Sequence, residues 1–300
     1  MVPHHAEDTR VGREPMTQSG RSLDRRFIAS LSHGLSVLEA VADSKNDIAL
    51  SDLARRVGFK KTNTWRLVHT LVKLGYLHQD PRTRNFRPAP RILALGYAYF
   101  DGLDLKKLPL PLLHELAARH NETVNLAVQS GDELIYIERI TTSQIVSINL
   151  HVGSRLPLYC TSLGRALICE MPSAWLQQYI QRIASDPRAR KYVQGGGKRL
   201  LQMLRETRER GYAVNDEELV KGLRAVASPI RDRTSKIVAA VCISVPTSRR
   251  TISDLRRIFA PDLVTVAADI SLVLGYRSKE STGISNDIRN TRSEFVGRAS

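Results

Sequence analysis

The side chains best suited to covalent chemistry lie in one short segment, residues 159–164, which has the sequence YCTSLG. A nucleophile such as Cys160 or Ser162 needs a base within hydrogen-bond reach and a third group that orients this base. His151 is the only histidine close to the segment in sequence, and the GxSxG motif of a nucleophile elbow does not occur here. An enzyme that uses Cys160 or Ser162 is therefore disfavoured.

The same segment could instead bind an anion. A helix that begins near Ser162 presents free backbone N–H groups and the positive end of its dipole, which suits a carboxylate. Gly164 would let the backbone approach such a ligand closely. An apolar wall for a ring or a short chain would come from Leu156, Leu158 and Leu163. Alternatively, the hydroxyls of Thr161 and Ser162 only cap the helix.

Composition narrows the class of protein. The chain has 300 residues, enough for about two domains, and a formal net charge of +15, which suggests a polyanionic partner such as nucleic acid. No apolar run reaches the roughly 18 residues of a membrane span, and the N-terminus lacks the apolar stretch of a secretory signal. The 3 cysteines lack CxxC spacing, so we expect no disulfide framework, metal or cofactor, and a cytoplasmic location.

Helical spacing and basic charge mark residues 25–89. One apolar face is expected on a first helix, at Leu31, Leu35, Leu38 and Val41. A second helix follows Leu50, with Ser51 as N-cap and Gly58 just after its end. A third helix covers 61–74 and has one face that consists of Thr64, Leu67, Val68, Leu71 and Leu74. Two short helices joined by a tight glycine turn are typical of a helix-turn-helix.

The third helix is expected to enter the major groove of DNA by its N-terminal end, with Thr62, Asn63 and Arg66 at base edges. Two short strands around a Pro and Arg turn follow at 75–88 and predict a basic wing that contacts phosphates or a minor groove. The expected DNA-contacting residues are Lys61, Thr62, Asn63, Trp65, Arg66, His69, Arg82, Arg84 and Arg87. Trp65 could instead pack beside the wing or helix, and the whole module could be a protein-interaction domain with a solvated basic face.

The remaining chain predicts a linker and a second domain. Residues 90–108 contain an apolar helix, which we interpret as a dimerisation element, or else as a helix packed on its own DNA-binding module. In 109–276 strands and helices alternate, with a hairpin at 123–139, a strand at 145–150, a loop at 186–198, strands near 223–231 and 236–245 and a last helix near 252–274. Residues 1–24 and 277–300 are polar and are expected to be disordered tails. The predicted fold class is α+β.

At this point the sequence resembles the IclR family of transcriptional regulators. The matching segments are GYL at 75–77, GSRLPLY at 153–159, TSLGRAL at 161–167, RGYA at 210–213, DEE at 216–218, GLRA at 222–225 and SVP at 244–246. The resemblance implies a winged helix-turn-helix, a GAF-like effector domain with an antiparallel sheet and flanking helices, and a homodimer or homotetramer. It also implies effector contacts at Ser162, Leu163, Asn215, Ala225, Cys242 and Ser244.

A narrower resemblance concerns the branch that regulates the β-ketoadipate pathway. It depends on FIASL at 27–31, SIN at 147–149 and YCTS at 159–162. This branch implies control of a catabolic operon for protocatechuate, 4-hydroxybenzoate or a related aromatic acid, with operator DNA and a small carboxylate as partners. The alternatives are a regulator that senses short-chain 2-oxo or hydroxy acids, and a DNA-binding protein without a ligand. Glu217 and Glu218 could contact the ligand or only form a turn, and Arg155 and Arg224 could balance an anion or only form surface ion pairs.

Overall fold

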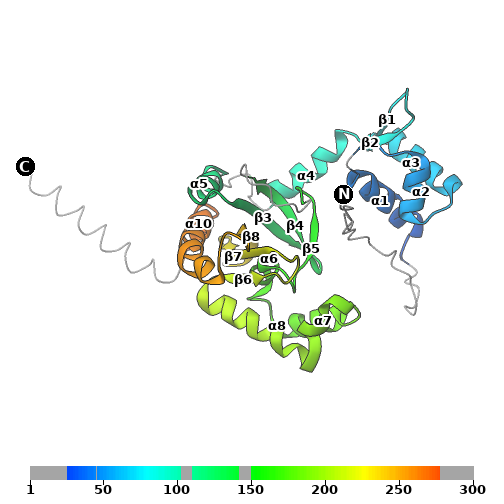
Figure 1. Ribbon diagram of the computed structural model, residues 1–300. Coiled ribbons are helices and arrows are strands. Elements are labelled where there is room, and N and C mark those ends of the chain that lie inside the picture. Colours follow the sequence, from blue (N-terminus) through cyan, green and yellow to red (C-terminus); the bar gives the residue numbers. More distant parts are fainter. Residues whose placement is uncertain (1–25, 45, 103–109, 142–149, 278–300) are drawn as a thin grey trace, which may run out of the picture. The chain divides into compact units, whose positions relative to one another are not determined.

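Two structural units divide the chain between Gly102 and Leu103. The structure, a computed structural model, describes residues 26–44, 46–102, 110–141 and 150–277 (Figure 1). The expected disordered tails lie outside these residues, apart from residue 277, and so do residues 103–108 of the expected linker. The two units are described separately below.

Three helices form the body of the N-terminal unit: α1 (Ala29–Ala42), α2 (Leu50–Val57) and α3 (Lys61–Lys73). They pack around a small apolar core that consists of Val37, Ala40, Val41, Leu53, Val68, Leu71, Leu77 and Phe86. The turn between α2 and α3 depends on Gly58, which has a φ of +72° and ends α2 in the left-handed conformation, where a Cβ is strained. This turn confirms the predicted helix-turn-helix.

The predicted wing is also present. Strands β1 (Leu77–Gln79) and β2 (Phe86–Pro88) pair in antiparallel fashion, and Ile48 forms an isolated bridge to Phe86 on the other side. In the turn between the strands, the Asp80 carboxylate accepts hydrogen bonds from the backbone N–H groups of Arg82 and Thr83, each at 2.8 Å. The N–H groups of Thr83 and then Arg82 hold the pKa of Asp80 below its usual value, so the Asp80 carboxylate remains a hydrogen-bond acceptor within the turn.

Two local predictions in this unit are wrong. Leu31 and Leu35 are 61% and 51% exposed, because α1 turns Val37, Ala40 and Val41 toward α2 and α3 instead. Ser51 lies inside α2, which begins after Ala49 and has no side-chain cap. The wide apolar surface of α1 made its buried face ambiguous from spacing alone.

The linker helix α4 (Arg91–Gly102) belongs to the N-terminal unit. Its first residue is fixed to that unit, because the Arg91 guanidinium donates to the carbonyl oxygen of Leu74 at 2.6 Å and lies over the ring of Tyr76. Further along, Leu93 and Leu95 are 74% and 58% exposed. Leu93 and Leu95 therefore do not pack on their own module.

A six-stranded antiparallel sheet organises the C-terminal unit, in the order β5-β4-β3-β8-β7-β6. The strands are β3 (Thr123–Ser130), β4 (Glu133–Ile140), β5 (Arg155–Pro157), β6 (Ala213–Asp216), β7 (Leu223–Arg231) and β8 (Ile237–Pro246). The β3–β4 hairpin and the β7–β8 hairpin lie where the alternating apolar patterns predict them. This sheet with its helices confirms the α+β class.

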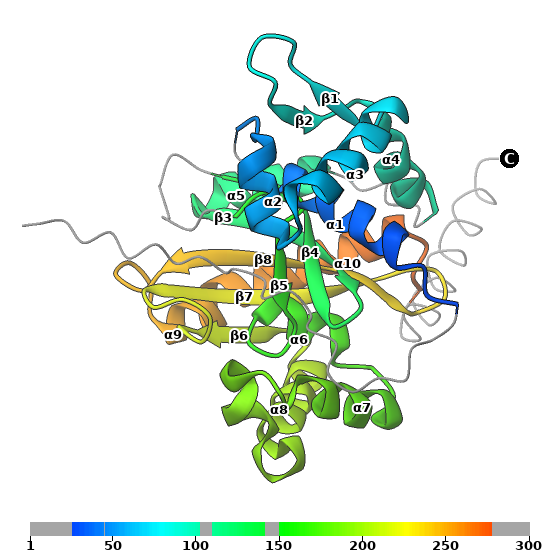
Figure 2. The ribbon, with the colours of Figure 1, turned by 90° about the vertical axis from the view of Figure 1, so that its right-hand side faces the viewer.

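Helices cover both faces of this sheet. On one face lie α5 (Leu110–His120) and α10 (Ala260–Val273), which follows the short α9 (Ile252–Asp254) and a π-helical turn at Leu255–Phe259 (Figure 1). On the other face α6 (Ser162–Ile168) contacts β3, β7 and β8. Behind α6 lie α7 (Ser173–Ile183) and α8 (Arg190–Arg210), which Figure 2 shows next to each other below the sheet. The main core cluster fills the space between the sheet, α6, α7 and α8.

Several predictions for this unit need correction. The expected loop at 186–198 contains a 3-10 turn at Pro187–Ala189 and the start of α8, whose only irregular part is Gln194–Gly197. Asn215 and Asp216 lie in β6, and Pro172 is the N-cap of α7. Of the expected strand at 145–150, residues 145–149 lie outside the described part and Leu150 is not in a strand.

Candidate DNA interface and ligand pocket

The outer face of α3 carries the side chains expected to contact DNA. Thr64, Val68 and Leu71 point into the core, and this fixes the opposite face of the helix toward solvent. All six of the expected residues on α3 are exposed: Lys61, Thr62, Asn63, Trp65, Arg66 and His69. No ion pair joins Arg66 to another residue of the described chain, so its guanidinium is available to an external acceptor. The geometry is that of a recognition helix.

Trp65 has a partner on its own helix. Its indole stacks on the imidazole of His69, with ring centroids 5.1 Å apart and an angle of 18° between the planes. The side chain is nevertheless 52% exposed. Trp65 therefore packs against its own helix and still exposes about half of its side chain to solvent.

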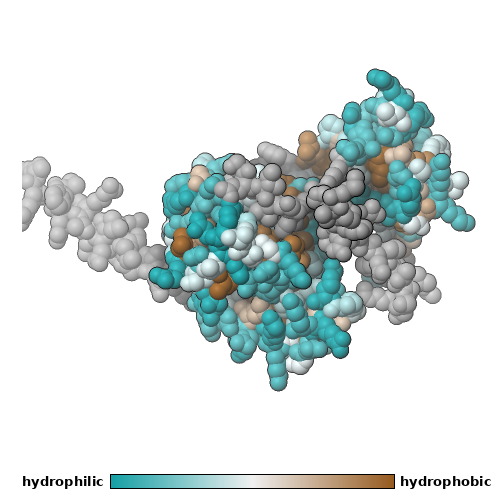
Figure 3. Space-filling view, viewed as in Figure 1, coloured by the Kyte–Doolittle hydropathy of each residue, from teal (hydrophilic) through white to brown (hydrophobic). Residues whose placement is uncertain are grey.

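The three arginines of the wing are exposed as well. Arg82 and Arg84 lie in the turn between β1 and β2, and Arg84 has a φ of +61° that directs the chain back into β2. Arg87 lies on β2 with its guanidinium 4.0 Å from Asp47, a long and exposed ion pair that restrains the side chain weakly. The tip of this hairpin is hydrophilic in the space-filling view (Figure 3).

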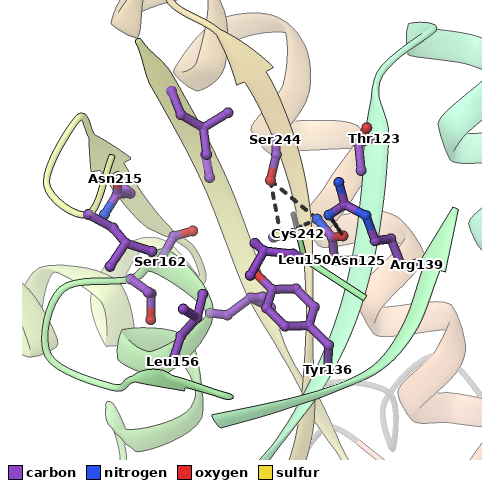
Figure 4. A pocket seen from close by; sticks show the side chains of 15 residues that line it. Thr123, Asn125, Tyr136, Arg139, Leu150, Leu156, Ser162, Asn215, Cys242 and Ser244 are labelled. Carbon is purple, nitrogen blue, oxygen red and sulfur yellow. Dashed lines mark hydrogen bonds between the residues drawn. The ribbon is translucent and has the colours of Figure 1, made fainter. Parts of the chain in front are cut away.

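A cavity opens in the C-terminal unit between the sheet and α6 (Figure 4). It offers a volume of about 40 Å³ to the centre of a water-sized sphere. Seven of the nine residues expected at the ligand site line it, namely Leu156, Ser162, Leu163, Asn215, Ala225, Cys242 and Ser244. Thr161, whose hydroxyl was considered from the sequence, also lines the cavity. The cavity has further lining residues that the sequence did not indicate, namely Thr123, Asn125, Tyr136, Arg139, Leu150, Leu219 and Leu223.

Leu158 and Gly164 are not in the cavity wall, and their expected role at the ligand is wrong. Leu158 is fully buried behind the wall, and a Cβ on Gly164 would lie 2.2 Å from its carbonyl oxygen. The glycine is therefore required for the close approach of α6 to residue 158, not for the approach of a ligand. A glycine is required both where two backbone segments approach closely and where a ligand approaches the backbone, so the sequence alone does not distinguish the two cases.

The start of α6 is capped by the protein itself. Thr161 is the N-cap, and its hydroxyl oxygen accepts the backbone N–H of Gly164 at 3.0 Å while its own proton goes to the Pro157 carbonyl. The capping alternative thus describes Thr161 correctly. Ser162 lines the cavity although it is only 2% exposed. The helix is only 7 residues long, so it contributes a small dipole.

The sheet side of the cavity is a polar network across three strands. Asn125 on β3 is paired in register with Arg139 on β4 and with Cys242 on β8. Its amide nitrogen donates to Ser244 Oγ at 3.3 Å and to Cys242 Sγ at 3.5 Å, and its amide oxygen accepts from Arg139 at 2.8 Å (Figure 4). Burial raises the pKa of Tyr136, so its hydroxyl stays neutral and able to donate a hydrogen bond in the cavity.

A buried ion pair lies behind the opposite end of the cavity. Arg165 on α6 is 1% exposed and donates to both carboxylate oxygens of Glu218, at 2.9 and 3.1 Å, and to the carbonyl oxygens of Tyr159 and Val214. The hydroxyl of Tyr192 donates to the same carboxylate at 2.6 Å. Glu218 therefore positions the segment that precedes the cavity-lining Leu219, and it does not contact the cavity itself.

The other charged residues considered for the ligand are engaged in local contacts. Glu217 accepts the backbone N–H of Gly222 at 2.7 Å, as the turn alternative expects. Arg155 pairs with Glu133, and Arg224 pairs with Asp216 at 2.6 Å and donates to the Arg250 carbonyl. None of Glu217, Arg155 and Arg224 is among the described residues that line the cavity.

The thiols are poorly suited to nucleophilic chemistry. Burial raises the pKa of Cys160 to about 12 and that of Cys169 to about 11, and it also raises the pKa of Cys242. His151 contacts Ser154 rather than Cys160. Within the part of the chain that the structure describes, no group of three or more His, Cys, Asp or Glu could hold a metal, and no helix is long and apolar enough to cross a membrane.

Sequence reasoning missed the residues that β3 and β4 contribute. A signal was present, because Thr123 and Asn125 alternate along a strand in the same way as Ser244 and Cys242, which they face in register. Finding them required the pairing of β3 with β8, which are more than a hundred residues apart in sequence. Arg139 follows from the same register, as the partner of Asn125 on the other neighbouring strand.

A winged helix with a basic, exposed recognition face, joined to a domain with a small enclosed cavity, defines the class of ligand-responsive transcription regulators. Comparison with known families agrees with this class. Residues 30–81 match the IclR helix-turn-helix domain, and residues 97–272 match the C-terminal domain of the bacterial transcriptional regulator IclR. The chain belongs to the IclR family of transcriptional regulators.

Individual relatives are similar over most of their length. The chain is 34% identical over 248 residues to the Pca regulon regulatory protein of Pseudomonas putida, covering 82% of this chain and 84% of the relative. It is 27% identical to the transcriptional repressor IclR of Escherichia coli strain K12, covering 88% and 96%. These relatives are transcription regulators rather than enzymes, so catalysis by Cys160 or Ser162 is excluded as the account of this family's activity.

Solved structures share the fold. An IclR family transcriptional regulator from Brucella abortus is 27% identical, with a TM-score of 0.64 over 83% of this chain and 93% of the other. An IclR homologue from Microbacterium hydrocarbonoxydans, solved in complex with 4-hydroxybenzoate, has a TM-score of 0.68 at 22% identity, covering 82% and 98%. The second likeness establishes the fold only.

Proposed function

We propose that this protein controls a catabolic operon in the cytoplasm in response to a small carboxylate, most simply an aromatic acid. The observation that carries the proposal is an apolar cavity with a few convergent polar groups, in the same chain as an exposed, basic recognition helix. In this mechanism, the acid binds in the cavity and favours one arrangement of the DNA-binding units over another.

In the proposed DNA complex, α3 lies in the major groove and its N-terminal turn faces the bases. Thr62, Asn63 and Arg66 supply the donors and acceptors that can distinguish base pairs, while Lys61 lies at the helix start. Because wing residues contact mainly backbone, they set the register and contribute the salt-dependent part of the affinity. The support is the common exposure of all these side chains on one module.

A second copy of the chain is the proposed partner of the N-terminal unit. The exposed apolar side chains there include Phe27, Ile28, Leu31 and Leu35 on or before α1, and Leu93 and Leu95 on α4. An exposed apolar surface of this extent is unfavourable in a monomer and typical of an oligomer interface. A dimer would present two α3 helices to the two halves of a palindromic operator.

The aromatic character of the acid is supported by the 34% identical regulator of the Pca regulon and by the apolar side chains of the cavity. Leu150 and Leu156 lie between its two polar ends (Figure 4), and Leu163 also lines the cavity. A flat ring is a good match for such a space, provided that the leucines shift outward on binding.

A short-chain 2-oxo or hydroxy acid is the second candidate, and the volume of the cavity favours it. One ordered water needs roughly 10–15 Å³ measured in this way, so the cavity's 40 Å³ accommodates only a few heavy atoms without rearrangement. The two candidates differ in this respect, because a ring acid requires movement of the wall and a short acid does not.

A thermal-shift screen of the full chain separates these possibilities. The panel contains 4-hydroxybenzoate and other aromatic acids, short-chain 2-oxo acids, and the primary amide of each acid. A ligand at a hundred times its Kd stabilises the folded state by about 2.7 kcal/mol, which shifts the melting temperature measurably. Stabilisation by ring acids supports the first candidate, stabilisation by short acids alone supports the second, and no stabilisation by any acid refutes carboxylate sensing.

A further inference from the structure

The cavity has two chemically different ends. In Figure 4, Ser162 and Asn215 lie at one end, and Thr123, Asn125, Arg139 and Ser244 lie at the other. Among the described residues that line the cavity, Arg139 is the only one that carries a formal charge. A carboxylate ligand therefore meets one full positive charge, and it meets this charge at the β3–β4 end.

Arg139 has a neutral partner where an arginine usually has an anionic one. Its Nη1 donates to the amide oxygen of Asn125 at 2.8 Å, and no ion pair with a carboxylate occurs within the described part of the chain. The adjacent Glu138 uses its carboxylate to accept the backbone N–H of Arg139 at 2.9 Å. The side chain is partly buried, so a guanidinium with unused donors is held near an apolar space. Such a fork matches both oxygens of a carboxylate.

Asn125 fixes this arginine. The amide is 1% exposed, and its nitrogen is committed to Ser244 and Cys242 on the neighbouring strand. Only the amide oxygen is then left to face Arg139, so the side chain cannot rotate without losing hydrogen bonds in a buried place. Asn125 lies on β3, Arg139 on β4, and Ser244 and Cys242 on β8. Because these three strands are paired, the guanidinium is held by the rigid part of the sheet.

The opposite end is uncharged and largely satisfied. Asn215 donates to the Cys160 carbonyl at 2.6 Å and accepts from the Glu218 backbone, and the Thr161 hydroxyl caps α6. The buried charge of Arg165 is already neutralised by Glu218. This end can accommodate a hydroxyl or another neutral group, but it offers no unneutralised charge to an acid.

We propose that Arg139, positioned by Asn125, binds the carboxylate of the effector, and that the uncharged end of the effector points toward Ser162. This assignment builds on the proposed function, and it moves the acid from the start of α6 to the β3–β4 side of the cavity. The ligand class that fits is a monocarboxylate with an apolar middle and a hydroxyl or similar neutral group at the far end. Arg139 determines the preference of the cavity for an acid over the corresponding amide, and Asn125 is a positioning residue.

The test compares each acid with its neutral amide, using 4-hydroxybenzoate with 4-hydroxybenzamide and pyruvate with pyruvamide. Affinities are measured by titration calorimetry, or by competition where binding is weak, on the full chain. A charge-assisted hydrogen bond is stronger than a neutral one, so we expect Arg139→Gln to weaken binding of the acid by roughly 10- to 100-fold and to leave the amide within about threefold. Arg155→Gln, an arginine outside the cavity wall, is the matched control and should change neither.

A second variant keeps Arg139 but makes its guanidinium unavailable to the carboxylate of the effector. Asn125→Asp is nearly isosteric and gives Arg139 an internal counter-ion, so it should cause a similar loss for the acid. Binding of the amide reports that the cavity is intact in either variant. If the affinities for the acid and the amide keep the same ratio in Arg139→Gln, whether both are unchanged or both fall equally, the assignment is refuted while carboxylate sensing stands. If the unmodified protein binds no acid at all, the proposed function fails, and the assignment fails with it.

Discussion

The buried pair between Arg165 and Glu218 gives a stability prediction that can be worked out from its contacts. Glu218→Gln keeps the shape of the side chain but removes the charge that faces a guanidinium only 1% exposed. Leaving one partner of a buried ion pair uncompensated costs about 3–5 kcal/mol. The carbonyl oxygens of Tyr159 and Val214 still accept from Arg165, and Glu218 is 10% exposed, so we expect the lower end, about 3 kcal/mol.

For a unit of this size, about 3 kcal/mol corresponds to a fall in melting temperature of roughly 6–12 °C. The assay is urea denaturation of the full chain in a Trp65→Phe background, so that Trp175 on α7 reports only the C-terminal unit. The exposed neighbour Glu217 gives the matched control, because Glu217→Gln keeps an acceptor for Gly222 and should cost less than about 1 kcal/mol.

A double-mutant cycle identifies the cause of the loss. If the cost of Glu218→Gln arises from the uncompensated charge of Arg165, the same change should cost much less in an Arg165→Met background. A loss below 1 kcal/mol in Glu218→Gln, or an equal loss in both backgrounds, would refute the reasoning. Because Glu218 precedes Leu219, which lines the cavity, the single variant should also bind acids more weakly than the control does.

Three further predictions concern other parts of the chain. Arg66→Ala should weaken binding to the specific operator by roughly 10- to 100-fold. Arg84→Ala should weaken binding to all DNA sequences alike and reduce the slope of log affinity against log salt concentration by about 1. Anisotropy titrations at several salt concentrations test both variants. Gly164→Ala should destabilise the C-terminal unit by about 1–3 kcal/mol or more in urea denaturation, because its Cβ would overlap the backbone of Leu158; a stability like that of the unmodified chain contradicts this packing. Cys160 and Cys169 should react slowly with a disulfide reagent at pH 8, because burial raises their pKa values to about 12 and about 11, and fast labelling of these thiols in the folded chain argues against this burial.

The sequence predicted those elements whose signals are local. The glycine at the end of α2, the alternation in the β3–β4 and β7–β8 hairpins and the polar face of α3 are each specified within about ten residues, and all of them are found. The buried face of a helix was mispredicted where apolar residues lie on more than one side of it. Leu31 and Leu35 belong to an apolar surface that surrounds most of α1, so spacing could not tell which side meets the core.

The lining of the cavity was predicted only in part. Ser162, Leu163 and Asn215 lie close to recognisable motifs, whereas Asn125 and Arg139 enter the cavity through the register of strands that are distant in sequence. The role of Gly164 was misjudged because the sequence does not show which backbone a glycine meets. The sequence also does not show that the charge of Arg165 is neutralised by Glu218, because this ion pair forms only in the folded chain.

The central claim is that an acid in the cavity of the C-terminal unit changes the affinity of the N-terminal unit for its operator. The most direct test is a fluorescence anisotropy titration, at one fixed salt concentration, of operator DNA selected from genomic fragments, with and without an acid that stabilises the chain. Coupling between two sites is typically 1–3 kcal/mol, so we predict that the Kd for the operator changes by roughly 5- to 150-fold. An operator Kd that stays the same when the cavity is saturated with that acid would contradict the account.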